Sequence, residues 1–171
     1  NDFVVGSQNG INTTHSFGVN YTDEFGSKFK MNSSYFFNKT INNTEQLINQ
    51  NFFTTNTTNQ IYTSSALGSG TNNNHRFNVR MEYKLNDKNT FIFTPNASIQ
   101  TNANSSRNDA STQQSDGPLL NSTLNRFTND LSGYNLAGDF LWQHNFDKKG
   151  RTISFNLRGN NTANTGTTEL L

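Results

Sequence analysis

Three histidines, His15, His75 and His144, are the side chains of this chain best suited to metal binding or proton transfer. None of them lies within a few residues of another histidine or of clustered carboxylates at the spacing of a metal site. The chain also has no cysteine, so thiolate ligands and disulfides are excluded. We therefore expect structural or surface roles for the histidines, and neither a metal nor another cofactor.

Hydrolase and nucleotide chemistry are not indicated either. Serine is abundant, but no Gly-x-Ser-x-Gly stretch is present. Gly68-Ser69-Gly70 is not followed by the Lys-Ser/Thr of a phosphate-binding loop. The formal net charge is +1 and no basic run occurs, which argues against a nucleic-acid partner. The sequence predicts no catalytic residues, and we expect a protein that is not an enzyme.

The remaining candidates for a functional role are charged residues that recur at every second position. In the stretch 75–85, HRFNVRMEYKL, one row holds Phe77, Val79, Met81, Tyr83 and Leu85, and the other holds Arg76, Asn78, Arg80, Glu82 and Lys84. Successive side chains of a strand point to opposite faces, so this pattern predicts a strand with an apolar and a charged face. Helical spacing would mix the two sets.

Two more stretches alternate in the same way, which gives three hairpins at about 11–38, 75–100 and 131–161 with strands of about ten to twelve residues. Their predicted turns are Thr22–Gly26, Asn86–Asn89 and Asp147–Gly150. Between the hairpins the alternation fades into Asn, Thr, Ser and Gly, so 39–74 and 101–130 are predicted to be long loops. Two aromatic islands, 51–54 and 60–63, are strand extensions or a small hairpin within the first loop.

Composition separates this chain from a disordered one. Only 30% of the residues are hydrophobic, but there are 15 Phe and 5 Tyr, and aromatic residues at a period of two indicate sheet. No apolar run is long enough for a membrane helix, although alternating barrel strands would not produce one. Long strands joined by alternating short turns and long loops are typical of a transmembrane barrel. The alternative is a soluble antiparallel sheet with one face on a core.

Several segments of the sequence resemble a known family, and the resemblance covers nearly the whole chain. GSQNGINTTHSFGVNY, SSYFFN, NNNHRFNVRMEYKLNDKNTFIFTPNASIQ and KKGRTISFNL resemble the outer-membrane β-barrel proteins of Bacteroidetes, which are similar to TonB-dependent receptors. The resemblance implies a barrel of about twenty-two strands, a plug domain, and ligand uptake powered by the inner-membrane TonB complex. It also implies outer-membrane lipid and a surface lipoprotein as partners. It supplies no catalytic residue and no ligand contact.

We therefore expect an all-β fold, namely a six-stranded antiparallel segment of one outer-membrane barrel domain with short periplasmic turns and long extracellular loops. Residues 1–171 would be a piece of that domain, because about eight strands are the smallest number that closes a barrel. The function expected is receptor-type uptake. The alternatives are a structural or secretion-machinery barrel and a soluble β-sheet adhesin module.

Two groups of residues are the candidates for function. The first would face the lumen, where charges bind ligand or pair across neighbouring strands to stabilise the wall: Arg76, Arg80, Glu82, Lys84, Asp139 and Arg158. The second, Phe52, Phe53 and Tyr62, lies in the first predicted loop and would either contact ligand or pack the loop on itself.

Overall fold

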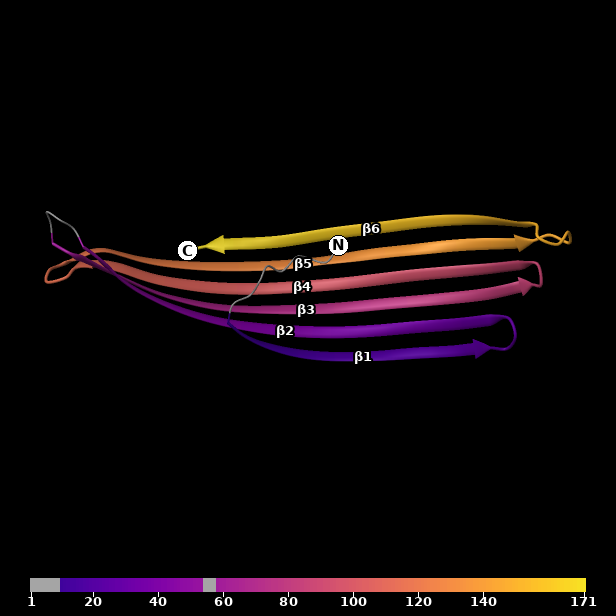
Figure 1. Cartoon of the computed structure of the whole chain (residues 1–171), viewed down its shortest axis with the longest axis horizontal. Coiled ribbons are helices and arrows are strands. Elements are labelled where there is room, and N and C mark those ends of the chain that lie inside the picture. The colour runs from indigo at the N-terminus through magenta and orange to yellow at the C-terminus, as the bar shows by residue number, and fades with distance from the viewer. Residues whose placement is uncertain (1–9, 54–57) are drawn as a thin grey trace.

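A computed structural model describes residues 10–53 and 58–171 of the chain. Six strands form one antiparallel sheet in the order of the sequence, so each strand pairs with the next (Figure 1). The strands are β1 (Ile11–Phe25), β2 (Phe29–Phe52), β3 (Gln60–Asn86), β4 (Asn89–Gln114), β5 (Leu119–Asn145) and β6 (Thr152–Leu170). The predicted all-β, six-stranded antiparallel fold is confirmed.

Three short turns lie together at one end of the sheet, which we call the turn end (Figure 1, right). They are residues 26–28, 87–88 and 146–151. Gly26 and Gly150 have positive φ, which glycine adopts without a steric cost. The first turn is shorter than predicted: Thr22–Phe25 continues β1, because the Asp23, Glu24 and Phe25 backbones pair with β2.

The predicted long loops at 39–74 and 101–130 are wrong, because both segments continue as strand. At the opposite end, which we call the far end, β2 ends at Phe52, β3 begins at Gln60, and residues 115–118 connect β4 to β5. The two aromatic islands are the ends of β2 and β3, where Phe52 pairs with Gln60. Polar side chains bond across the strands here: the Thr63 and Ser111 hydroxyls are 2.8 Å apart, and Ser64 donates to Asn108 at 2.8 Å. The backbone ladder persists without hydrophobic alternation.

The register gives the sheet two chemically different faces. The apolar face carries the odd-numbered side chains of β1–β4 and β6 and the even-numbered ones of β5, since Phe91 pairs with Trp142 and Trp142 with Phe155. The polar face carries the others. Bulges at 84–86 and 112–113 limit this rule to the strand segments between them.

Burial is opposite to that of a soluble domain. Among the described residues no hydrophobic side chain is buried, and the four buried residues are Asn42, Ser64, Gln100 and Asn102, at 6–8% exposure. All four lie on the polar face, whereas Ile99 on the apolar face is 44% exposed. Side chains crowd on the inside of a curved sheet, so the polar face is the concave one.

The described residues include no helix long and apolar enough to span a membrane.

Candidate functional site: an apolar band and a polar concave face

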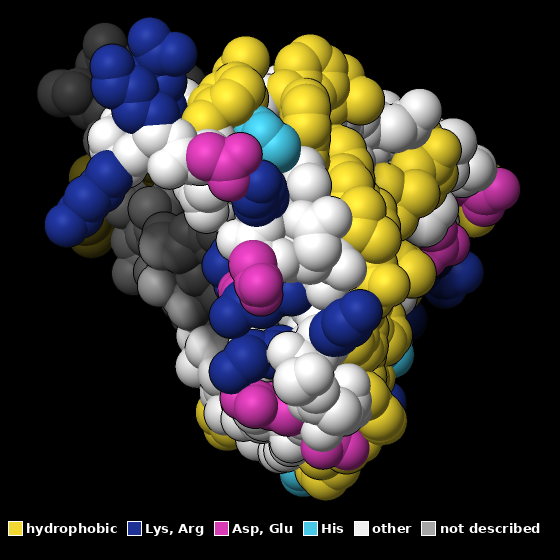
Figure 2. Space-filling model, turned by 90° about the vertical axis from the view of Figure 1, so that its right-hand side faces the viewer, with side chains coloured by type: hydrophobic (Ala, Val, Ile, Leu, Met, Phe, Trp, Pro, Cys, Tyr) yellow, Lys and Arg dark blue, Asp and Glu magenta, His cyan; other side chains and the backbone are white. Residues whose placement is uncertain are grey.

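An apolar band crosses the sheet on its apolar face, in the half next to the turn end. Its members are Phe17, Val19, Tyr21, Phe25, Phe29, Met31, Tyr35, Phe37, Phe77, Val79, Met81, Tyr83, Leu85, Phe91, Phe93, Ala97, Ile99, Tyr134, Leu136, Phe140, Trp142, Ile153, Phe155 and Leu157. One row of register partners runs through five strands: Met31, Met81, Phe93, Phe140 and Leu157. Figure 2 looks onto the turn end and shows hydrophobic side chains gathered along one side of the sheet.

The band ends abruptly toward the far end. The first row of register partners beyond it holds Lys39, Asn73, Thr101, Ser132 and Thr165, all polar. On β3 the band extends from Phe77 to Leu85, which is about 26 Å of strand at about 3.3 Å per residue. A strip of constant width is therefore apolar, and the strands continue beyond it as mainly polar sheet, in which Leu47, Leu67 and Leu124 are exposed apolar exceptions.

Aromatic clusters mark both margins of the band. At the turn end the Phe25 and Phe29 rings are 5.7 Å apart. Asn89 Oδ1 accepts hydrogen bonds there from Trp142 Nε1, at 3.1 Å, and from His144 Nδ1, at 2.8 Å. Because an amide oxygen only accepts, this contact requires the proton of His144 on Nδ1.

The other two histidines lie at the opposite margin. His75 Nδ1 is 2.9 Å from the Tyr35 hydroxyl, and its ring is 4.8 Å from that of Phe37. His15 pairs with Lys39 one row further along. The described residues contain no group of three or more His, Cys, Asp or Glu that could hold a metal ion.

The six charged residues predicted to share a face do lie together on the polar face, in the half next to the turn end: Arg76, Arg80, Glu82, Lys84, Asp139 and Arg158. Arg158 Nε is 2.6 Å from Asp139 Oδ1 across β5 and β6, and Arg80 is 3.8 Å from Glu82 within β3. Arg158 is 77% exposed, so solvent screens this pair and it adds little to stability. Pairing therefore accounts for part of this group.

Sequence reasoning missed two further charges of this group. Glu24 and Lys30 are register partners on the polar face of β1 and β2, and their side chains are 2.6 Å apart. Lys30 also pairs in register with Glu82 of β3. The missed signal was the row alternation itself, because the predicted turn at 22–26 removed Glu24 from the strand.

Toward the far end the polar face becomes an array of neutral amides. Asn42 Nδ2 donates to Asn12 Oδ1 at 2.8 Å, and Gln100 Nε2 donates to Asn72 Oδ1 at 3.0 Å. The Asn74 side-chain oxygen is buried and has no hydrogen-bond partner among the residues that the structure describes. Amides offer both donors and acceptors, so this surface can bind uncharged polar groups of either kind.

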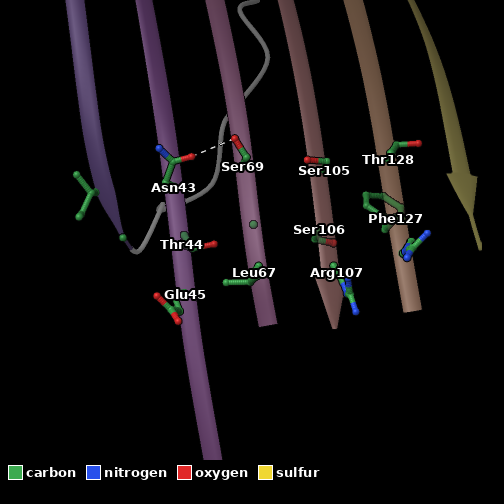
Figure 3. A pocket seen from close by; sticks show the side chains of 14 residues that line it. Asn43, Thr44, Glu45, Leu67, Ser69, Ser105, Ser106, Arg107, Phe127 and Thr128 are labelled. Atoms are coloured by element: carbon green, nitrogen blue, oxygen red, sulfur yellow. Dashed lines mark hydrogen bonds between the residues drawn. The ribbon is translucent and has the colours of Figure 1, made fainter. Parts of the chain in front are cut away.

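A hollow of about 710 Å³ lies across β2–β5 toward the far end of the sheet (Figure 3). Its centre is one row of register partners on the polar face, Thr44, Gly68, Ser106 and Phe127. The Thr44 hydroxyl occupies the space that a Cβ on Gly68 would take, so glycine allows this hydroxyl to approach the β3 backbone. Figure 3 shows the Thr44 hydroxyl directed toward β3 and the Phe127 ring directed toward β4.

Charged residues are part of the lining of this hollow, among them Arg107 and Arg126. Arg107 pairs in register with Arg126, and its guanidinium binds Asp109 at 2.7 and 3.1 Å. The hydrogen bond that Arg107 donates to the Asp109 carboxylate raises the pKa of Arg107 above its ordinary value. Glu45 also lines the hollow, so its lining carries both signs of charge.

The three aromatic residues predicted to lie in a loop are placed differently by the structure. Phe52 ends β2 and Tyr62 lies in β3, both on the polar face, with register pairs Phe52–Gln60 and Gln50–Tyr62. Only Phe53 lies in a connection, and it is 81% exposed. Phe52 and Tyr62 are thus diagonal neighbours on the sheet rather than loop residues.

Comparison with known proteins identifies no relative. No protein-family model matches the chain, and no curated protein matches it. Among solved structures, the cryo-EM structure of the membrane pore complex of pneumolysin is similar at a TM-score of 0.19 and 7% identity, over 92% of this chain and 31% of that one. The chain therefore spans about a third of the pneumolysin chain. A TM-score this low carries no argument, so the function is argued from the two faces.

Proposed function

We propose that this chain is part of the wall of a transmembrane β-barrel in the outer membrane of a Gram-negative bacterium. The apolar band would contact lipid and the concave polar face would line the lumen. The observation that carries the proposal is the inverted burial: Asn42, Ser64, Gln100 and Asn102 are buried, and the described residues bury no hydrophobic side chain. Outward apolar and inward polar rows are the pattern of such barrels.

The size of the band supports this proposal. Strands of outer-membrane barrels are tilted by about 35–45°. The Phe77–Leu85 segment, about 26 Å long, would then cover roughly 20 Å of membrane thickness, close to the apolar height of about 25 Å typical of these barrels. The aromatic clusters at both margins correspond to the two interfacial girdles.

The soluble adhesin alternative fits the band less well. A soluble antiparallel sheet covers its apolar face with a second layer. Here the uncovered face would be the convex one, with Phe77 and Leu85 each more than 40% exposed. A second layer would have to pack against a convex surface while polar amides remained on the inside of the curve.

Receptor-type uptake is the activity that we propose for the complete barrel. The charged and amide-rich polar face supports passage of a polar ligand, and Phe52, Phe53 and Tyr62 at the far end support capture outside the membrane. Dependence on TonB, a plug domain and a surface lipoprotein rest on the family resemblance. A structural or secretion-machinery barrel would use the same wall, and the sequence preceding this chain separates the two: a plug domain supports uptake.

The absence of cysteine allows a direct test of the wall assignment. Single cysteines at positions 78–81 of the full-length protein in outer-membrane vesicles would carry a nitroxide label. We expect labels at positions 79 and 81 to relax faster in the presence of oxygen, which partitions into lipid. Labels at positions 78 and 80 should relax faster in the presence of a water-soluble nickel chelate. The proposal is wrong if accessibility lacks this period of two or has the opposite phase.

A further inference from the structure

The turn end of the sheet carries five cationic side chains, which we call the basic rim: Lys28, Lys88, Lys148, Lys149 and Arg151. They lie in or directly beside the three short turns, and all are exposed. Figure 2, which faces this end, shows Lys and Arg side chains distributed over it. Three turns that are distant in sequence thus contribute cations to one edge of the sheet.

Most carboxylates near the rim are already engaged by other groups. Asp23 accepts a hydrogen bond from the Tyr21 hydroxyl at 2.7 Å, and Glu24 binds Lys30 at 2.6 Å. Asp147 binds Lys88 at 2.5 Å. Within the described part of the chain, Lys28, Lys148, Lys149 and Arg151 form no ion pair with a carboxylate, and Asp87 is the acid at this end that no contact engages. The rim therefore has excess positive charge.

The basic rim continues the apolar band without a gap. Phe25 and Phe29 flank the turn that carries Lys28, and Phe146 and Ile153 flank the turn with Lys148, Lys149 and Arg151. Long cationic side chains place their methylene stems along apolar surface and their charges in water. This arrangement is suited to a boundary between hydrocarbon and a layer of anions.

The opposite margin of the band differs. In the first row beyond it, across β2–β6, Lys39 is the one cation among Asn73, Thr101, Ser132 and Thr165. The margin at the turn end is therefore more positively charged than the opposite margin, and its charge is complementary to phosphate.

We propose that the basic rim binds the phosphates of anionic phospholipids in the leaflet that surrounds the turn end. This inference rests on the proposed function, since it requires lipid against the apolar band. It goes further, because it assigns a headgroup preference to one leaflet. A lipid surface is favoured as the occupant because it meets the rim and the adjoining Phe25, Phe29 and Phe146 side chains together.

Trp142 provides the probe, because it is the single tryptophan of the chain and lies on the apolar face near the rim. The full-length protein, with Trp142 as its sole tryptophan, is placed in nanodiscs that contain either brominated phosphatidylglycerol or brominated phosphatidylcholine in a neutral background. Bromine in the acyl chains of a lipid that contacts Trp142 quenches the fluorescence of its indole. The ratio of the two quenching efficiencies gives the headgroup preference at this position.

We expect phosphatidylglycerol to be preferred by roughly fivefold or more at low salt, with the preference shrinking as salt screens the rim. The triple variant K148Q/K149Q/R151Q should lose it. The control K39Q/R107Q/R126Q removes the same charge from the apolar face beyond the band and should retain it. Equal quenching by both lipids overturns the rim proposal and leaves the membrane wall intact. Quenching by neither lipid overturns both.

Discussion

Met81 is the position at which the membrane assignment makes its strongest energetic prediction. It lies midway along the β3 part of the apolar band, between its register partners Met31 and Phe93. If the band spans hydrocarbon, Met81→Arg places a cation near the bilayer midplane, which costs about 2–4 kcal/mol of folding free energy. A matched change on the other face, Asn78→Arg, enters a water-filled lumen beside Arg80 and should cost little.

Depth supplies a second, independent comparison on the same face. Leu85 is four residues from Met81 toward the turn end, about 13 Å along the strand. At a tilt of 35–45° this is about 10 Å in depth, so Leu85→Arg lies near the interface and should cost about 0–1 kcal/mol. The expected order of destabilisation is therefore Met81→Arg, then Leu85→Arg, then Asn78→Arg.

The assay is equilibrium unfolding of the full-length protein from lipid vesicles by denaturant, with folding followed by electrophoretic mobility without heating. Equal costs at Met81 and Asn78 would refute the assignment of faces. Equal costs at Met81 and Leu85 would keep the faces but refute the depth, because only a membrane imposes a gradient along one row of a strand.

Two further predictions concern the two ends of the sheet. An epitope tag between Asp116 and Gly117 should be stained on intact cells and one after Lys88 should not. The strands extend far beyond the apolar band only at the far end, and outer-membrane barrels place their long extensions outside the cell. Staining of the second tag would reverse the orientation. The hydrogen bond from Lys88 lowers the pKa of Asp147, so the stabilisation from this pair is present above the ordinary carboxyl pKa and is lost as pH falls through the lowered one. Lys88→Gln should return the NMR titration midpoint of Asp147 toward its ordinary value, and an unchanged midpoint would contradict the contact.

The half of the sheet next to the turn end was predictable because its residues alternate in hydrophobicity. Phe77 to Leu85 against Arg76 to Lys84 predicts a strand and its two faces. The pairing Asn86–Asn89 and the turn before β6 followed from local turn residues. In this half, each strand carries the information for its own structure.

The far half was not predictable by the same means. Residues such as Thr63, Ser64, Asn108 and Ser111 are polar on both faces, so a period of two leaves no trace in hydropathy. Asparagine also has low strand propensity, which favoured loops at 39–74 and 101–130. Most of the described residues of these segments are in strands because they pair in register with at least one neighbouring strand. That pairing depends on the register of the whole sheet, which no single segment encodes.

The amide array was missed for a related physical reason. Hydropathy places Asn42, Gln100 and Asn102 at the surface, yet they are buried because the sheet curves toward them. Curvature also explains why Gly68 and Gly70 lie on this face, where a Cβ would meet the Thr44 and Asn104 side chains. The burial of these amides depends on the assembled sheet, whereas the sequence shows only that the residues are polar.

The open edges of the sheet set a condition on the proposed membrane wall. The strand order runs from β1 to β6 without closure, so β1 and β6 each have one edge that no described strand pairs. In hydrocarbon each unpaired backbone group costs several kcal/mol, and about eight strands are needed to enclose even a packed interior. If Phe17–Phe25 and Ile153–Leu157 do lie in lipid, further strands must therefore extend the sheet at both edges. The inverted burial would then continue around the barrel, with the amides of the concave face sharing one lumen.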